Sequence, residues 1–171
     1  MKTSVAVFAF LAFTVCAHAQ DLTSVDFFLR DIEGTDQSFQ KYLKSVRVSD
    51  DQPKKGVIIL SFWALWCKPC QQEMKSLRET FEKYKDRNVH YLAINTDNVR
   101  SIAKVKAWVA AEKLPYNFWL DPDSEVFKKL NGQSMPYSLM LSESGKLLAK
   151  RTGFLAGDEK DIEKDILKYL E

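Results

Sequence analysis

The chain contains the sequence Ser61-Phe-Trp-Ala-Leu-Trp-Cys-Lys-Pro-Cys70. It begins inside the run Val57–Trp63, whose β-branched and aromatic residues are typical of a strand that is buried on both faces of a sheet. After the second cysteine, four apolar residues follow at the spacing of one helix face: Met74, Leu77, Phe81 and Tyr84. The sequence therefore places two cysteines where a buried strand ends and a helix begins.

The spacing of Cys67 and Cys70 indicates redox chemistry. Residues at i and i+3 in the first turn of a helix lie on nearly the same side, so their sulfurs can close into a disulfide or open to a dithiol. The free N–H groups at the helix start and the charge of Lys68 favour the thiolate of Cys67, whereas Cys70 is one turn inside the helix and less accessible. We expect Cys67 to be the attacking nucleophile and Cys70 to be the resolving thiol.

Two other interpretations of the cysteine pair exist. A static disulfide would restrain the unfolded chain only weakly, because two residues separate the cysteines. Half of a zinc site would need more ligands, but the chain beyond residue 19 has no other cysteine and one histidine, His90. We therefore expect no metal and no other cofactor.

Composition indicates one globular domain. The chain has 171 residues, 46% of them hydrophobic, and a formal net charge of +2. A charge so near balance does not suggest binding to nucleic acid or to an anionic membrane surface. With only 6 glycines and 5 prolines, the chain is neither collagen-like nor of low complexity.

Residues 1–19 are expected to be a cleaved signal peptide. Lys2 precedes the apolar run Val5–Val15, and Ala17-His-Ala19 fits the small-residue cleavage pattern. The apolar run is too short to cross a bilayer as a helix. A lipoprotein signal would use Cys16, but the residues before this cysteine do not fit that pattern. We expect residues 20–171 to form an exported, periplasmic domain.

Hydrophobic patterning predicts the remaining elements. Strands are expected at Val25–Leu29, Val57–Trp63, Val89–Asn95, Asn117–Leu120, Tyr137–Leu141 and Lys146–Thr152. Helices are expected after Cys70 and at Arg100–Lys113, Asp123–Leu130 and Glu159–Leu170, while Phe39–Val48 fits a short helix or a strand-like segment. Alternating strands and helices favour parallel pairing first, and the hairpin signal Ser142–Gly145 favours antiparallel pairing later. The expected fold is α/β, with a mixed central sheet and helices on both faces.

These residues together resemble the thioredoxin superfamily, and within it the exported TlpA/ResA-like thiol–disulfide oxidoreductases. The resemblance covers about Val25 to Leu170 and rests on Phe62–Cys70, Glu73, Leu120-Asp-Pro-Asp123, Met135-Pro136, and Ser144-Gly-Lys146 with Gly153. It implies a thioredoxin-like fold and an enzyme whose substrates are disulfide-bonded proteins.

The resemblance also implies roles for single residues. Met135-Pro136 matches the cis-proline that faces the cysteine pair in this family, where the backbone of Met135 would pair with an extended substrate peptide. Trp66 and Lys68 are expected to contact substrate. Trp63 is expected to be mainly a packing residue.

Glu73 occupies the place of a carboxylate that acts near the cysteine pair in the TlpA/ResA-like group. Classical thioredoxins carry a buried aspartate in the preceding strand, and Ser61 stands at that position here. A half-buried carboxylate near Cys70 would have a raised pKa and could accept or relay the proton of the thiol. The alternative is a solvated helix residue. The sequence departs from the family at Tyr137-Ser138, where a Thr-Thr pair is common, and in the long, charged segment Leu43–Lys55.

We therefore expect an exported enzyme that reduces or isomerises disulfides in other exported proteins and is recharged by a membrane or exported thiol-redox partner. Two other classes stay open. A binding module or copper chaperone could hold Cu(I) with the same thiolates, although no neighbouring ligand supports this. A peroxidase would need a peroxide-activating environment that the sequence does not indicate.

Overall fold

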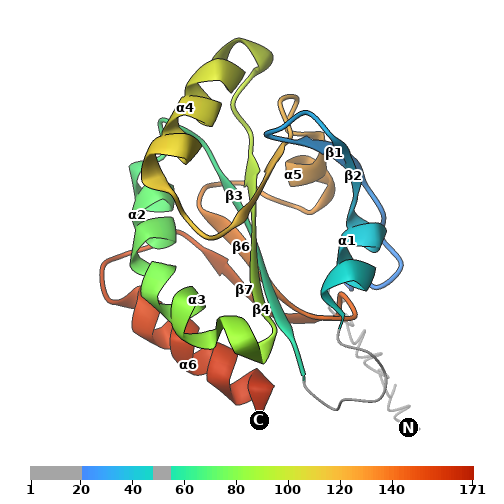
Figure 1. The fold of residues 1–171 in the computed structure, drawn as a ribbon, viewed down its shortest axis with the longest axis vertical. Helices are drawn as coiled ribbons and strands as arrows, with labels where there is room; N and C mark the ends of the chain where they lie inside the picture. Colours follow the sequence, from blue (N-terminus) through green and yellow to red (C-terminus); the bar gives the residue numbers. More distant parts are fainter. Residues whose placement is uncertain (1–20, 48–54) are drawn as a thin grey trace, which may run out of the picture.

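Seven strands form one mixed sheet in the computed structural model, which describes residues 21–47 and 55–171 (Figure 1). The strands are β1 Phe28–Asp31, β2 Asp36–Ser38, β3 Val57–Trp63, β4 Val89–Asn95, β5 Asn117–Leu120, β6 Tyr137–Ser142 and β7 Leu147–Thr152. Their order in the sheet is β2-β1-β5-β4-β3-β6-β7. The β3–β4 and β4–β5 pairs are parallel and all others are antiparallel, which confirms the expected change of direction.

Helices cover both faces of this sheet, as expected (Figure 1). They are α1 Phe39–Val46, α2 Lys68–Ser76, α3 Arg78–Tyr84, α4 Ile102–Glu112, α5 Glu125–Lys129 and α6 Asp158–Leu170, with short 3-10 turns η1 Lys85–Arg87 and η2 Val99–Ser101. Residues of α2, α3, α4 and α6 pack in one hydrophobic cluster, and residues of α1 and α5 pack in the other.

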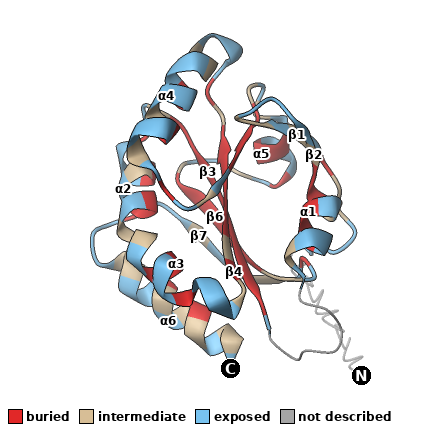
Figure 2. Ribbon diagram, in the orientation of Figure 1, coloured by how far each residue is buried: buried red, intermediate tan, exposed pale blue. Residues whose placement is uncertain are grey.

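Strand β3 runs between these two clusters and is buried at every residue (Figure 2). Because side chains alternate along a strand, Ile59 and Trp63 face the cluster under α2, while Leu60 and Phe62 face the cluster under α5. Each large apolar side chain buried in this way contributes about 1.5–3 kcal/mol. The strand that leads to the cysteines is therefore firmly held on both sides.

The N-terminal strand differs from the expected Val25–Leu29, since β1 begins at Phe28 and pairs with β2 in a hairpin. The reason is Asp26, whose carboxylate accepts hydrogen bonds from the backbone N–H groups of Phe27 and Gln40 and from the hydroxyl of Ser38. This side chain ties the segment to the start of α1 and keeps it out of the sheet. The strand-like interpretation of Phe39–Val48 is wrong, because α1 begins at Phe39 with Ser38 as its N-cap.

The apolar face after the cysteines is carried by two helices, α2 and α3, with Leu77 between them. The Leu77 N–H still bonds to the Glu73 carbonyl, and the Phe81 N–H bonds to the Leu77 carbonyl, both at 3.0 Å. All four apolar residues consequently remain in one buried cluster.

The expected signal peptide, residues 1–19, lies outside the described residues, as does part of the charged segment before β3. Among the residues that the structure describes, no helix is both long and apolar enough to cross a membrane. Export and the start of the mature domain at residue 20 stay predictions.

Candidate active site

The two cysteines lie at the start of α2, immediately beyond the end of β3. Cys67 is the N-cap residue of α2, and its Sγ accepts the backbone N–H of Cys70 at 3.3 Å. The two residues form a disulfide, with Cα atoms 5.3 Å apart, so the structure represents the oxidised protein. Cys67 is 3% exposed and Cys70 is 1% exposed. The expected difference in accessibility is therefore small in this state.

Side chains at the end of the neighbouring strand β4 hold the loop before Cys67. The carboxylate of Asp97 accepts the Leu65 N–H at 2.7 Å and the Asn95 side-chain amide at 2.8 Å. Gln71 adds a side-chain hydrogen bond to the Leu65 carbonyl. The sequence pattern gives Asn95 and Asp97 no separate role, although polar residues at or just beyond the end of a buried strand are a usable signal.

The residues expected to contact substrate surround the disulfide in different ways. Trp66 is 70% exposed and Lys68 is also exposed, whereas Trp63 is buried and packs against Trp108. The Met135–Pro136 bond is cis, as the resemblance implied. Thr96 links this turn to the motif, because its hydroxyl contacts the Met135 sulfur and its N–H bonds to the Trp63 carbonyl.

Glu73 is 2% exposed, so the solvated alternative is wrong, and the carboxylate is buried more deeply than the expected half-buried one. Its Oε1 atom lies within hydrogen-bonding distance of three hydroxyl groups: Tyr91 at 2.7 Å, Ser138 at 3.0 Å and Ser61 at 3.1 Å. These residues come from β4, β6 and β3, so the register of three strands assembles the carboxylate's environment. Cys70 and Glu73 are three residues apart on α2 and therefore neighbours on one helix face.

Hydroxyl protons around Glu73 can be rearranged. Ser61 and Ser138 are also 3.0 Å from each other, and each hydroxyl has one proton. When both serines donate to Glu73, no proton remains for the contact between them, and when one donates to the other, Glu73 loses a donor. The network can thus accommodate both a charged and a neutral carboxyl group.

Burial raises the pKa of Glu73, and the hydroxyl donors and the charge of Arg151 act in the opposite direction. Burial and the nearby Glu73 charge raise the pKa of Tyr91 well above its usual value, so this phenol stays protonated and remains a donor. A carboxyl group with a raised pKa takes up a proton more readily at neutral pH. Glu73 is in this respect suited to receive the proton of a neighbouring thiol.

Tyr91 and Ser138 are partners of Glu73 that the sequence analysis missed. In the sequence Ser138 stands out only as a departure from a family pattern, although a polar residue in an otherwise apolar strand is an indication of a buried network. Tyr91 fits the apolar pattern of its strand and gives no separate signal. His90 lies near Asn88, with 2.7 Å between Nε2 and Oδ1, and in the described part of the chain no three His, Cys, Asp or Glu side chains are grouped as a metal site.

Known proteins share both the sequence pattern and the fold. The pattern of the AhpC/TSA family matches residues 26–164. The chain is 30% identical over 128 residues to "Thiol-disulfide oxidoreductase ResA" of Bacillus thuringiensis, covering 75% of this chain and 66% of the relative, just under two thirds of its length. It is 26% identical over 135 residues to "Sporulation thiol-disulfide oxidoreductase A" of Bacillus subtilis, covering 78% and 74%.

Solved structures confirm the expected thioredoxin-like fold. A putative thiol:disulfide interchange protein DsbE from Chlorobium tepidum is similar with a TM-score of 0.70 and 26% identity, covering 86% of this chain and 94% of that chain. A thioredoxin-like protein from Porphyromonas gingivalis has a TM-score of 0.67 at 24% identity, covering 84% and 88%.

Proposed function

Because the chain belongs to the AhpC/TSA family and is similar to proteins named thiol–disulfide oxidoreductases, we propose that it reduces disulfide bonds in exported proteins. The observation that carries the proposal is the Cys67–Cys70 disulfide at the start of α2, where the N-cap sulfur accepts a backbone N–H. Opening this bond gives a dithiol whose first sulfur lies at the positive end of a helix.

The first step is nucleophilic attack by Cys67. In the reduced protein the thiolate of Cys67 attacks one sulfur of the substrate disulfide, forms a mixed disulfide and releases the other substrate sulfur as a thiolate. The Cys70 N–H that bonds to Cys67 Sγ in the oxidised state would stabilise the negative charge of this thiolate.

The second step closes the enzyme disulfide. Cys70 gives its thiol proton to the carboxylate of Glu73, and the resulting thiolate attacks Cys67 Sγ. The bond between Cys67 and the substrate breaks, and the second substrate sulfur leaves as a thiolate. Two electrons have then passed from the enzyme dithiol to the substrate, and the enzyme is left with its Cys67–Cys70 disulfide. A membrane or exported partner with its own dithiol would reduce this bond again.

Substrate binding would use the surface around Cys67. Trp66 and Lys68 directly precede and follow Cys67 in the sequence, and they expose a large aromatic ring and a positive charge. The turn at Met135–Pro136, tied to β3 through Thr96, would pair with an extended peptide that carries the disulfide.

Reduction of insulin with dithiothreitol as electron donor tests the activity. We expect the wild-type protein to accelerate precipitation of the insulin B chain and the Cys67→Ser and Cys70→Ser variants to give the uncatalysed rate. A wild-type rate no higher than that of the variants would exclude the proposed disulfide reductase activity. Tight stoichiometric Cu(I) binding without reductase activity would instead favour the copper-binding class.

We also propose export, supported by the signal pattern of residues 1–19. The full chain is expressed in a bacterium, and the N-terminus of the periplasmic protein is sequenced. We expect it to begin at Gln20, whereas a cytosolic protein that retains residues 1–19 would contradict the proposal.

A further inference from the structure

Ser61, Ser138 and Arg151 form one row across three strands. Ser61 of β3 lies directly opposite Ser138 of β6, and Ser138 lies directly opposite Arg151 of β7. Directly opposed residues project from the same face of a sheet. Since the two serines contact Glu73 on that face, Arg151 lies on the same side, one strand beyond them.

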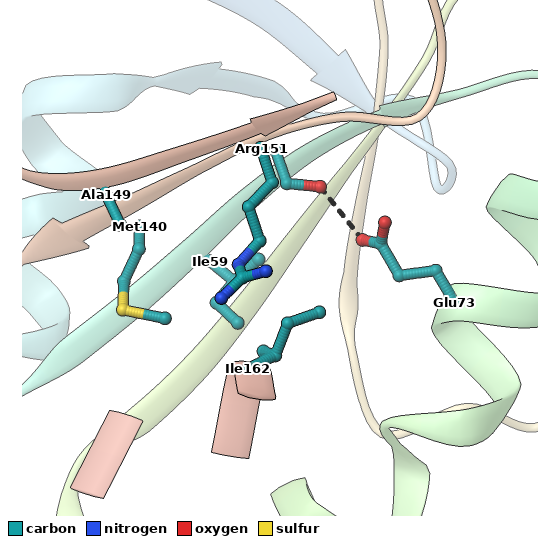
Figure 3. A pocket seen from close by; sticks show the side chains of 7 residues that line it. Ile59, Glu73, Met140, Ala149, Arg151 and Ile162 are labelled. Carbon is teal, nitrogen blue, oxygen red and sulfur yellow. Dashed lines mark hydrogen bonds between the residues drawn. The ribbon is translucent and has the colours of Figure 1, made fainter. Parts of the chain in front are cut away.

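A small cavity separates Arg151 from Glu73 (Figure 3). The side chains of both residues extend toward it, Arg151 from β7 and Glu73 from α2, and its other polar lining residue is Ser138. The remaining lining is apolar, including Ile59 and Ile162. Its volume is about 10 Å³, close to the smallest space that holds one water molecule, and the three polar groups are enough partners for it.

The guanidinium of Arg151 forms an ion pair near the surface through one nitrogen and carries a second, buried N–H donor. Its Nη2 atom bonds to the Asp165 carboxylate of α6 at 2.6 Å, and both side chains are about one third exposed. Its Nε atom is shielded from solvent and has no hydrogen-bond partner among the residues that the structure describes. A buried donor without an acceptor is costly, and a water in the adjoining cavity would satisfy it.

We propose that Arg151 is a positioning residue for Glu73, which it reaches through one water molecule in the cavity between them. The guanidinium charge stabilises the ionised carboxyl group and so keeps Glu73 able to accept the proton of Cys70. This role rests on the proposed reductase function, but the electrostatic effect on Glu73 exists in the oxidised protein and can be measured without turnover.

Other charged and titratable groups near Glu73 also affect its proton affinity. Tyr91 of β4 donates to the carboxylate and stays protonated, and Tyr116 stacks on Tyr91 with ring centroids 4.4 Å apart. The two cysteines at the start of α2 are joined in a disulfide and do not titrate. Asp165 of α6 offsets part of the Arg151 charge. Among these side chains Arg151 alone brings a positive charge.

The experiment is a pH titration of Glu73 in the oxidised protein. Glutamate side chains are labelled with ¹³C, and the Glu73 carboxyl resonance is assigned by its absence in the Glu73→Gln variant. We expect Arg151→Gln to increase the proton affinity of Glu73 by about tenfold, because an opposite charge is lost. Arg151→Lys retains the charge and should restore most of the wild-type titration.

Asp165→Asn is the matched control, because it breaks the same ion pair and leaves the guanidinium in place. Because this change removes a negative charge, we expect the proton affinity of Glu73 to stay the same or to fall. Lys150→Gln removes a charge from the adjacent, exposed residue of β7 and should have no effect. An unchanged titration in Arg151→Gln, or an equal rise in Arg151→Gln and Asp165→Asn, overturns the proposal. If Arg151→Gln does not fold, a rise in Asp165→Asn alone still overturns it.

The insulin assay on the same variants separates this inference from the proposed function. We expect the pH profile of Arg151→Gln to shift toward higher pH, in step with the Glu73 titration. A shifted titration in a protein without reductase activity would contradict the proposed function and leave the electrostatic role of Arg151 intact.

Discussion

Glu73 combines full burial with hydrogen bonds that suit a charged group. Three hydroxyl groups surround its Oε1 atom, yet desolvation still raises its pKa. Folding therefore favours proton uptake by this side chain, and the same property that equips it to receive a thiol proton reduces the stability of the protein at higher pH.

We expect Glu73→Gln to stabilise the oxidised protein at about pH 8 and to have little effect at about pH 4. Because the folded-state pKa of Glu73 lies above the ordinary value of 4.5, the stability of the wild type falls as pH rises from that value through the folded-state pKa. Glutamine does not ionise, so the variant avoids this loss of folding stability, which is about 1.4 kcal/mol for each unit by which folding raises the pKa of Glu73. Urea unfolding at the two pH values measures the difference. Glu82→Gln, at an exposed position, is the control, and an equal gain at both pH values would contradict the argument.

Trp66 is expected to act in binding and not in folding. Its side chain is 70% exposed, so Trp66→Ala should change the free energy of unfolding by less than about 0.5 kcal/mol. Loss of an aromatic contact with substrate should raise KM for a disulfide-containing peptide about tenfold and leave kcat nearly unchanged. Phe28→Ala removes an aromatic residue of similar exposure from β1 and should leave KM unchanged. Equal KM values for wild type and Trp66→Ala would remove Trp66 from the binding surface.

Helix α5 shows how one side chain can support a whole element. The helix spans only Glu125–Lys129, which is too short to be stable alone. The buried carboxylate of Asp121 accepts the backbone N–H groups of its first three residues, at 2.9–3.3 Å. This gives a physical reason for the aspartate in the Leu120-Asp-Pro-Asp123 pattern.

We expect Asp121→Ala to reduce the free energy of unfolding by about 2 kcal/mol, because three backbone donors lose their acceptor. Asp121→Asn keeps an oxygen that can accept and should cost less. Asp123→Ala, at an exposed position in the same pattern, should change stability by less than about 0.5 kcal/mol. Chemical unfolding of the three variants tests the order, and a cost for Asp121→Ala no larger than that for Asp123→Ala would show that the carboxylate does not support α5.

The elements that the sequence predicts best are the strands whose residues are nearly all buried. The bounds of β3, β4 and β5 agree with the expected strands, because runs of buried β-branched and aromatic residues leave few alternatives. The hairpin of β1 and β2 was missed, because β2 has only three residues and Asp26 fixes the chain before β1 by side-chain bonds that have no periodic pattern.

The sequence predicts which residue types carry the chemistry of the candidate site, but not which residues from other strands surround them. Cys67, Cys70 and Glu73 lie close together in sequence, so spacing on one helix relates them. Ser138 contacts Glu73, and Arg151 lines the cavity beside it, only because β6 and β7 pair beside β3 in a particular register. Local patterns do not specify that register, and it becomes visible only in the folded sheet.

At the scale of the whole molecule, the disulfide links the chemistry to the stability of the fold. The oxidised protein is more stable than the reduced protein if folding favours the disulfide over the dithiol. The difference between their free energies of unfolding is proportional to the shift in reduction potential from the unfolded chain, with about 30 mV for each 1.4 kcal/mol. The stabilities of the two redox states therefore report how far the fold makes the cysteine pair more reducing or more oxidising.

We expect the oxidised form to be the more stable by about 2 kcal/mol, which corresponds to a potential about 40 mV below that of the unfolded chain. Part of this is the entropy lost by the unfolded chain when the short loop closes. In addition, Cys70 is almost fully buried and Glu73 is its neighbour on α2, so a thiolate of Cys70 in the reduced form is poorly solvated and near a carboxyl group. Urea unfolding at neutral pH, with and without a phosphine reductant, measures the difference. Cys67→Ser should not respond to the reductant, and a reduced form that is more stable than the oxidised form would indicate an oxidant in place of the proposed reductant.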